Sequence, residues 1–229
     1  MSDLPNQSRP ASGSIYERHQ LDAVAARWDA KARTWDSDLL NRECHLNEDD
    51  AYPRFLREAS LLIEAHREFC TGQGVLDVGC GTGLVLAELI PAFAWGLGVD
   101  ISAQMIDRAV QKQIPRARFV VADCFRMPEL CAPAGAAISR GVLLSHYGRV
   151  QGEQLLAACG SALVKGGFLI FDFLNQAAQI RHAHQPEHKT YFTPESVCLM
   201  ARRTGFARAS ILGGDPRERR VLLLLAQRD

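Results

Sequence analysis

The chain has 229 residues, a length that suits one domain with an extension. Its 26 basic and 26 acidic side chains give a formal net charge of zero, so bulk charge gives no reason to expect a nucleic-acid partner. No apolar run is long enough for a membrane-spanning helix, and the seven cysteines form no Cys-x-x-Cys pair, so we expect free thiols, a cytoplasmic protein and no membrane partner.

The N-terminal third is predicted to be a tail followed by a helical cap. Residues Met1–Ser14 are rich in Ser, Pro, Asn and Gln, which favours a mobile tail. We expect the cap over residues 15–71, in two helices. The first runs from Ile15 to about Trp35 and is rich in alanine, and the second, Pro53–Cys70, carries an i, i+3, i+4 apolar stripe.

From Gly74 onward, short apolar segments alternate with helical patterns. The predicted strands are Gly74–Val78, Ala94–Val99, Phe119–Ala122, Ala136–Ser139 and Phe168–Phe173. The predicted helices between them are Leu84–Ile90, Ser102–Gln113 and Val150–Leu163. In the second of these helices Ser102 is the expected N-cap, and the residues expected to face inward are Met105, Ile106, Ala109 and Val110. This alternation predicts right-handed crossovers and a mainly parallel sheet.

The C-terminal part predicts one more helix and a final pair of strands. The helix is Thr193–Thr204, and the strands are Phe206–Leu212 and Val221–Ala226. The turn between the strands is too short for a helical crossover, so we expect this pair to be antiparallel. The sequence therefore predicts an α/β, Rossmann-like doubly wound domain over residues 72–229. Its sheet is seven-stranded and mostly parallel with an antiparallel last strand, and the helical extension precedes it.

A glycine-rich turn follows the first predicted strand. Residues 75–83 read Val-Leu-Asp-Val-Gly-Cys-Gly-Thr-Gly and lead into a helix. Glycine permits positive φ and lets a ligand approach the backbone closely. Asp100 ends the second strand about twenty residues later, where a carboxylate can accept hydrogen bonds from both ribose hydroxyls, and Asp123 follows the third strand. Together these features predict a nucleoside-containing ligand at the carboxyl ends of the strands.

These motifs resemble the class I S-adenosylmethionine-dependent methyltransferases, in particular those that act on small molecules. The family motif of an acid, a variable residue and Gly-x-Gly-x-Gly is matched from Asp77 to Gly83. A dinucleotide fingerprint would need glycine at Leu84, and a P-loop would need Gly-Lys-Ser/Thr after the turn. The family signature of Gly-Gly before the fifth strand is matched within residues 163–171. The resemblance spans the chain from about Gly74 to the C-terminus.

The resemblance implies S-adenosylmethionine as cofactor and S-adenosylhomocysteine as its product. Asp77 would order the methionine amino group, Asp100 would hold the ribose hydroxyls, and Asp123 would take the adenine amino group. The other implied cofactor contacts are Gly79, Cys80, Gly81, Gly83, Ile101, Met105, Cys124, Phe125 and Arg140. We interpret Cys80, inside the turn, as a small filler of space and not as a nucleophile.

Residues 139–148 follow the fourth strand, and in the family this segment lies beside the transferred methyl group. Arg140 could pair with the cofactor carboxylate or with an anionic substrate, or it could be a buried structural arginine. His146 is the best candidate for a general base, because imidazole has a pKa near the working pH; the alternative is a packed or capping histidine. Tyr147 could orient the acceptor or simply pack.

Further substrate candidates come after the fifth strand. Asn175 could bond an acceptor, although Asn is also common in loops. Residues 181–192 form a polar insert that could be a lid, with His184, Lys189 and Tyr191 as substrate contacts. Three histidines in this insert could bind a metal ion, but spacing alone does not imply the ligand geometry, so we predict no metal.

The helical cap adds four candidates, of which Trp35 is the one expected to contact substrate. Trp28 and Trp35 are seven residues apart, on one face of the predicted helix, and Arg33 and His45 lie nearby. In small-molecule members of the family such an extension covers the substrate. The alternative is a helix that packs on the core with two tryptophans as anchors.

The segment after the fourth strand also bears on the acceptor. It reads Ser139-Arg140-Gly141-Val142 and lacks the Asn/Asp-Pro-Pro-Tyr signature of family members that methylate amino groups of nucleic acids and proteins. We therefore expect an enzyme that methylates a small, anionic metabolite, with oxygen favoured over nitrogen, as a monomer or homodimer. The alternatives are an RNA or protein methyltransferase and a nucleotide-binding module without catalysis.

Overall fold

The computed structural model of the protein describes residues 18–40, 51–141, 144–182, 189–212 and 220–227. The α-helices are α1 (Arg18–Ala32), α2 (Trp35–Leu40), α3 (Ala51–Ala65), α4 (Arg67–Cys70), α5 (Leu84–Leu89), α6 (Ala103–Gln111), α7 (Met127–Leu130), α8 (Arg149–Ser161) and α9 (Pro194–Arg203). Short 3₁₀ helices are η2 (Ile90–Ala92), η3 (Cys124–Arg126) and η4 (Gln176–His182). The strands are β1 (Gly74–Val78), β2 (Trp95–Asp100), β3 (Ala117–Val121), β4 (Ala134–Ser139), β5 (Leu163–Asn175), β6 (Tyr191–Phe192), β7 (Phe206–Leu212) and β8 (Arg220–Gln227).

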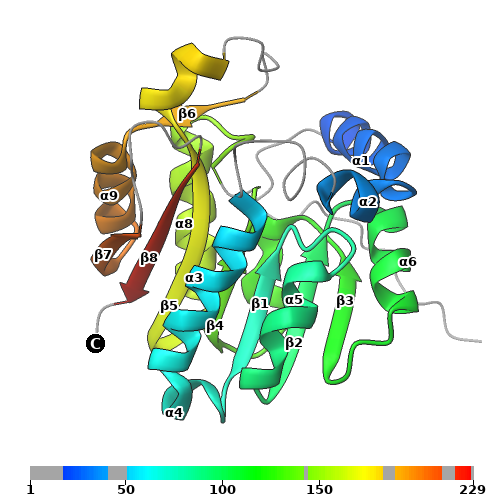
Figure 1. Ribbon diagram of the computed structural model, residues 1–229, viewed down its shortest axis with the longest axis horizontal. Coiled ribbons are helices and arrows are strands. Elements are labelled where there is room, and N and C mark those ends of the chain that lie inside the picture. Colours follow the sequence, from blue (N-terminus) through cyan, green and yellow to red (C-terminus); the bar gives the residue numbers. More distant parts are fainter. Residues whose placement is uncertain (1–17, 41–50, 142–143, 183–188, 213–219, 228–229) are drawn as a thin grey trace, which may run out of the picture.

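These strands form one sheet in the order β3-β2-β1-β4-β5-β8-β7, with β6 paired to β5 (Figure 1). The pairs among β1 to β6 are parallel, whereas β8 is antiparallel to both β5 and β7. The chain moves outward from β1 to β3 and then returns to the other side of β1 with β4. This reversal creates a switch point at the carboxyl ends of β1 and β4, the place where open α/β sheets bind ligands.

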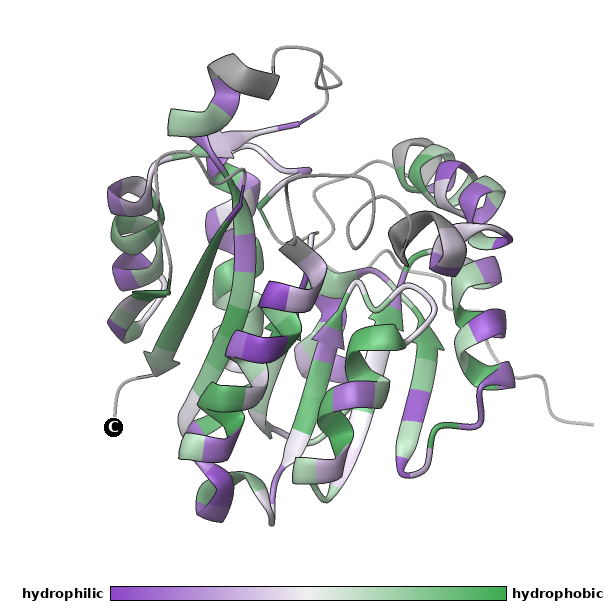
Figure 2. Ribbon diagram, in the orientation of Figure 1, coloured by the Kyte–Doolittle hydropathy of each residue, from purple (hydrophilic) through white to green (hydrophobic). Residues whose placement is uncertain are grey.

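Successive residues of the central strands pack on opposite faces of the sheet, as the two-residue period of a strand requires. Leu76 and Ala137 face helices α7, α8 and α9, whereas Val75 and Ile138 face α3 and α5. Because helices cover both faces, the central strands are apolar over most of their length, which Figure 2 shows as green ribbons at the centre of the molecule. The core therefore supports the central strands beneath the switch point.

The predicted Rossmann-like fold is confirmed, including the mostly parallel sheet and the single reversed strand near the C-terminus. Two differences concern strands. The two-residue strand β6 was not predicted, because its pairing with β5 has no local sequence signal. Strand β5 begins at Leu163 and not at Phe168, so that the Gly-Gly pair lies within it, and the register with β4 shifts between Ala134 and Ala136.

Two predictions about helices are wrong in detail. Val110 is 55% exposed, whereas its neighbour Ala109 is buried, because one residue further along a helix turns the side chain about 100° away from the core. Trp28 and Trp35 do not share one helix, since α1 ends at Ala32 and α2 begins at Trp35. Their rings nevertheless meet edge to face with 5.5 Å between centroids.

The N-terminal helices pack in two different ways (Figure 1). Helices α1 and α2 lie across the carboxyl end of the sheet, with α1 against α6. Helix α3 packs on the sheet itself, where Phe55 and Ile63 join the core. A cap that is separate from the domain over residues 15–71 stays a prediction, and the predicted tail to Ser14 lies outside the described residues. No helix within the described ranges is long and apolar enough to cross a membrane.

Candidate functional site

The turn after β1 depends on three glycines in the left-handed region of backbone conformation. Gly79, Gly81 and Gly83 have φ values of 71°, 52° and 79°, which strain any residue with a side chain. A Cβ atom on Gly81 would also come within 3.3 Å of Nε1 of Trp35, and within 4.0 Å of the Met105 sulfur. The indole of the cap helix α2 therefore lies directly against the bare backbone of the turn.

Several N–H groups of this turn are already used inside the protein. Gly79 and Cys80 both donate to the carbonyl oxygen of Val99, at 2.8 Å and 3.0 Å. Gly81 donates to Oδ2 of Asp100 at 2.9 Å. A phosphate at such a turn needs free N–H donors. This arrangement consequently favours a ligand without phosphate groups over a dinucleotide.

Asp77 is a buried carboxylate near the carboxyl end of β1, only 2% exposed. The backbone of Leu86 in α5 donates a hydrogen bond to it, but its Oδ2 atom has no hydrogen-bond partner among the described residues. Burial, and secondly the negative charge of Asp100, raise the pKa of Asp77 to about 7. A buried carboxylate oxygen without a partner is costly, so this position suits a cationic or hydrogen-bonding group that a ligand would supply.

Asp100, at the end of β2, is held in a fixed orientation by the backbone. Its Oδ2 accepts from Gly81 and its Oδ1 accepts from the N–H of Ser102, both at 2.9 Å. Burial raises the pKa of Asp100, and the hydrogen bonds from Ser102 and Gly81 oppose this shift. Each carboxylate oxygen can accept a further hydrogen bond. Asp100 can thus accept hydrogen bonds from two neighbouring hydroxyl groups and keep its hydrogen bonds from Gly81 and Ser102.

The residues after β3 form a third part of the site. Asp123 caps η3, with its Oδ1 accepting from the N–H of Phe125 at 3.1 Å. The Phe125 ring meets Tyr147 edge to face at 5.5 Å between centroids, and the Tyr147 hydroxyl lies 3.7 Å from the sulfur of Cys124. Burial raises the pKa of Cys124 to about 12, which keeps this thiol protonated. Tyr147 is therefore joined to the residues predicted to contact adenine.

The remaining predicted cofactor residues surround the same turn. Cys80 is buried with its sulfur 3.6 Å from the carbonyl oxygen of Gly81, and burial raises the pKa of its thiol far above the ordinary value. A protonated, buried thiol is a poor nucleophile. Ile101 is half-buried after β2, and Met105 is buried in α6.

Two aspartates fasten the cap helices to the turn and to α6. Asp36 of α2 accepts a hydrogen bond from the Thr82 hydroxyl and pairs with Nζ of Lys112 at 2.8 Å. Asp29 of α1 accepts from the Ser102 hydroxyl at 2.5 Å and from a backbone N–H at the start of α6 at 3.0 Å. Sequence reasoning did not identify these residues, because single acidic residues on a helix also occur on any solvated face.

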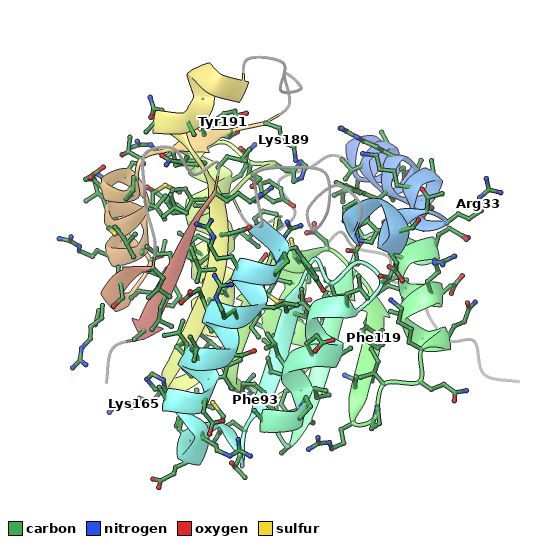
Figure 3. All side chains as sticks on the ribbon, viewed as in Figure 1. Arg33, Phe93, Phe119, Lys165, Lys189 and Tyr191 are labelled. Carbon is green, nitrogen blue, oxygen red and sulfur yellow. The ribbon has the colours of Figure 1, made fainter. Side chains whose placement is uncertain are left out.

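On the acceptor side, two separately predicted residues meet. Nζ of Lys189 lies 2.9 Å from Nε2 of His146, and the Trp28 ring meets the imidazole edge to face at 5.6 Å between centroids. An ammonium group has donors only, so Nε2 of His146 accepts this hydrogen bond. Figure 3 shows Lys189 and Tyr191 above the carboxyl ends of the strands, whereas Arg33 points outward from the cap.

Arg140 belongs to a buried ionic cluster that includes a residue the sequence did not suggest. Oδ1 of Asp172 in β5 accepts from the N–H of Gly141 at 2.6 Å and from Nη1 of Arg220 at 3.1 Å. Nε of Arg140 lies 4.0 Å from Oδ2 of the same carboxylate, and its guanidinium stacks over the ring of Tyr52 at 5.4 Å. An acidic residue inside the apolar stretch of β5 was the signal that could have revealed this cluster.

The other predicted substrate residues are only partly placed. Asn175 is buried at the end of β5, where its Oδ1 accepts from the N–H of Ala177 at 3.0 Å. Tyr191 is half-buried in β6. His184 and His45 lie outside the described residues, so the structure does not place them.

The sequence is similar to those of known methyltransferases. Residues 75–167 match a protein family described as methyltransferase domain. A ubiquinone biosynthesis O-methyltransferase of Idiomarina loihiensis is 30% identical over 159 residues, which cover 69% of this chain and 59% of that protein. A magnesium-protoporphyrin O-methyltransferase of Rhodobacter capsulatus is 42% identical over 116 residues, or 51% of this chain and 49% of that protein. The chain thus spans about half the length of the curated relatives it matches.

A solved structure extends the likeness over almost the whole chain. It is a magnesium protoporphyrin IX methyltransferase from Synechocystis PCC 6803 with bound SAH, with a TM-score of 0.71 and 17% sequence identity. The match covers 90% of this chain and 99% of that chain. At this identity the likeness concerns the fold.

Proposed function

We propose that this chain, which belongs to the class I S-adenosylmethionine-dependent methyltransferases, transfers a methyl group from S-adenosylmethionine to an oxygen atom of a small anionic metabolite. The observation that carries the proposal is the buried Oδ2 atom of Asp77, which has no partner among the residues described, beside a turn of three left-handed glycines. Such a carboxylate suits an amino group, and such a turn suits a ligand that lies against bare backbone.

The residues around the turn fit this cofactor. Asp77 would take its amino group, Asp100 its ribose hydroxyls and Asp123 the adenine amino group. Three N–H groups of the turn are bonded to Val99 and Asp100 and are therefore not offered to a pyrophosphate, which supports a cofactor without phosphates. When bound, S-adenosylmethionine supplies a methyl group activated by a positively charged sulfur.

The protein contributes position and the exclusion of water. The hydrogen bond of Asp29 and the ion pair of Asp36 hold α1 and α2 over the carboxyl end of the sheet, and Trp35 packs against the glycine turn. A cap in this place holds the reacting groups together and keeps water from them. Orienting two reactants at contact distance supplies a large part of the rate in a displacement of this kind.

His146 would remove the proton from a hydroxyl acceptor. Its Nε2 accepts a hydrogen bond from Lys189, so this nitrogen can take a proton only after the ammonium moves away. An anionic acceptor would draw Lys189 toward itself and so free Nε2. The pair therefore links the binding of an anion to the availability of the base.

The choice of oxygen over nitrogen has two supports. The segment after β4 lacks the signature of amino-methylating members of the family. The two curated relatives described above are named as O-methyltransferases, one of ubiquinone biosynthesis and one of magnesium-protoporphyrin. A small molecule is also the class of acceptor that those names indicate.

The test is a methyl-transfer assay with the full chain, S-adenosylmethionine and a panel of hydroxylated carboxylic acids, each matched with its amide. We expect S-adenosylhomocysteine to form with the acids and not with the amides. His146→Gln should lower kcat about a hundredfold or more and leave the Kd for S-adenosylhomocysteine unchanged. Arg33→Gln, at an exposed position of the cap, is the matched control. Equal formation of S-adenosylhomocysteine with the acids and with their amides would contradict the proposed anionic acceptor.

A further inference from the structure

Arg220 offers more hydrogen-bond donors than the described part of the chain uses. A guanidinium carries five N–H donors. Nη1 of Arg220 donates to Oδ1 of Asp172 at 3.1 Å and to the Ser145 hydroxyl at 3.4 Å. Within the described ranges Nε and Nη2 have no acceptor, although the side chain is only 10% exposed. A nearly buried cation with spare donors on one edge is suited to a ligand that carries acceptors.

Nη2 of Arg220 lies beside a glycine of the loop after β4. Gly141 has a φ of 80°, and a Cβ atom at this position would lie 3.8 Å from Nη2 of Arg220. No other atom of the described residues comes within 4 Å of that Cβ position, apart from the immediate chain neighbours of Gly141. Among the described residues, Gly141 thus places only a bare α-carbon beside Nη2 of Arg220, on the loop that follows β4.

Asp172 fixes two guanidinium groups in place at once. Its Oδ1 holds Arg220, and its Oδ2 lies 4.0 Å from Nε of Arg140. The Arg140 side chain is 8% exposed, and its position over Tyr52 holds the guanidinium plane. Buried charges of this kind are stable when their geometry is good and their remaining donors are satisfied. A second anion beside the two guanidinium groups would accept hydrogen bonds from donors that Asp172 does not use.

The cluster stands next to the acceptor side of the proposed active site. Arg220 begins β8, Asp172 lies in β5 and Gly141 follows β4, so all three are at the switch-point edge of the sheet. Ser145, which accepts from Arg220, immediately precedes His146 in the chain. An anion bound here would therefore belong to a molecule whose other end can reach the base.

We propose that Arg220, supported by Arg140, binds a carboxylate or an oxyanion of similar size on the methyl acceptor. This inference rests on the proposed function. The planar fork of an arginine matches the two oxygens of such a group and binds it through parallel hydrogen bonds. Asp172 is a positioning residue, because it holds the guanidinium through Nη1 and leaves Nε and Nη2 for the ligand. The same chemistry could come from the carboxylate of the cofactor, and the experiment separates the two sources.

The experiment measures the binding of butyrate and butyramide to the full chain saturated with S-adenosylhomocysteine, by ligand-observed NMR. We expect butyrate to bind and butyramide to bind at least tenfold more weakly. Arg220→Lys keeps a cation beside Asp172 but lacks the fork, so it should weaken butyrate binding at least tenfold. Arg208→Lys, on the exposed surface of β7, is the matched control and should change nothing. Equal binding of butyrate by both variants would overturn the inference.

A second titration identifies the source of the anion. S-adenosylhomocysteine carries a carboxylate, whereas 5′-methylthioadenosine lacks it. We expect Arg220→Lys to bind both nucleosides as the unchanged protein does, which also shows that the variant is folded. If the Arg220→Lys variant binds S-adenosylhomocysteine more weakly but binds 5′-methylthioadenosine as before, Arg220 contacts the cofactor carboxylate and the assignment to the acceptor is wrong. If the unchanged protein binds S-adenosylhomocysteine but no butyrate, this inference fails and the proposed function stands; if it binds no S-adenosylhomocysteine, the proposed function itself fails.

Discussion

Replacing Asp77 by Asn should change the stability of the protein without cofactor more favourably at alkaline pH than at acidic pH, and at the same time weaken cofactor binding. The pKa of Asp77 is raised from 3.8 to about 7 by burial and by the charge of Asp100. Below about pH 4 the carboxyl group is protonated in both the folded and the unfolded chain. Between about pH 4 and pH 7 the unfolded chain releases this proton and the folded chain keeps it, so rising pH favours unfolding.

The size of this effect follows from the pKa shift. Each pH unit in the window costs the folded state up to about 1.4 kcal/mol, so the full shift of Asp77 amounts to about 4 kcal/mol. Asn does not titrate, and the pH-independent cost of burying its amide cancels when one variant is compared at two pH values. The free energy of unfolding of Asp77→Asn minus that of the unchanged protein should therefore rise by about 3 kcal/mol between pH 5 and pH 8.

The assay is urea unfolding at several pH values without cofactor, together with calorimetric titration of S-adenosylhomocysteine at pH 8. Because Asp77→Asn removes a charge-assisted hydrogen bond to the amino group, we expect its Kd to rise roughly tenfold to a hundredfold. Parallel stability curves for the two proteins would refute the idea that Asp77 carries a raised pKa. An unchanged Kd would refute its role in holding the cofactor.

Three further substitutions test other parts of the site. Asp100→Ala should abolish measurable cofactor binding in calorimetry, and retained affinity would remove that residue from the site. Gly81→Ala and its matched control Gly166→Ala, with φ values of 52° and 76°, should each lose roughly 1–2 kcal/mol in thermal unfolding, but only Gly81→Ala should bind S-adenosylhomocysteine more weakly. Asp36→Asn breaks the ion pair with Lys112, and its free energy of unfolding should change by less than about 1 kcal/mol. Stopped-flow fluorescence should show that this variant releases S-adenosylhomocysteine faster. An unchanged release rate would mean that the cap does not limit exchange of the cofactor.

Sequence patterns predicted well the features that depend on neighbouring residues. The glycine turn appears between β1 and α5 with all three glycines at positive φ. Ser102 caps α6 with a side-chain hydrogen bond, as predicted, and Thr193, predicted as the start of the last helix, caps α9 in the same way. Such features are local because turns and caps are formed by residues two to four positions apart.

Contacts between distant segments could not be predicted in the same way. Lys189 and His146 were assigned separate roles, and only the folded chain shows that they share a hydrogen bond across 43 positions. The Asp172–Arg220 pair, 48 positions apart, depends on the antiparallel register of β5 and β8. Pairing of this kind is set by register and by loop geometry, which one sequence does not encode locally.

The central claim is that the glycine turn and its three acids bind S-adenosylmethionine and not a dinucleotide. Calorimetric titration of the full chain with S-adenosylmethionine, and separately with NAD, tests it most directly. We predict saturable binding of S-adenosylmethionine and no heat from NAD. Binding of NAD, or no binding of S-adenosylmethionine by a cooperatively folded sample, would contradict the account.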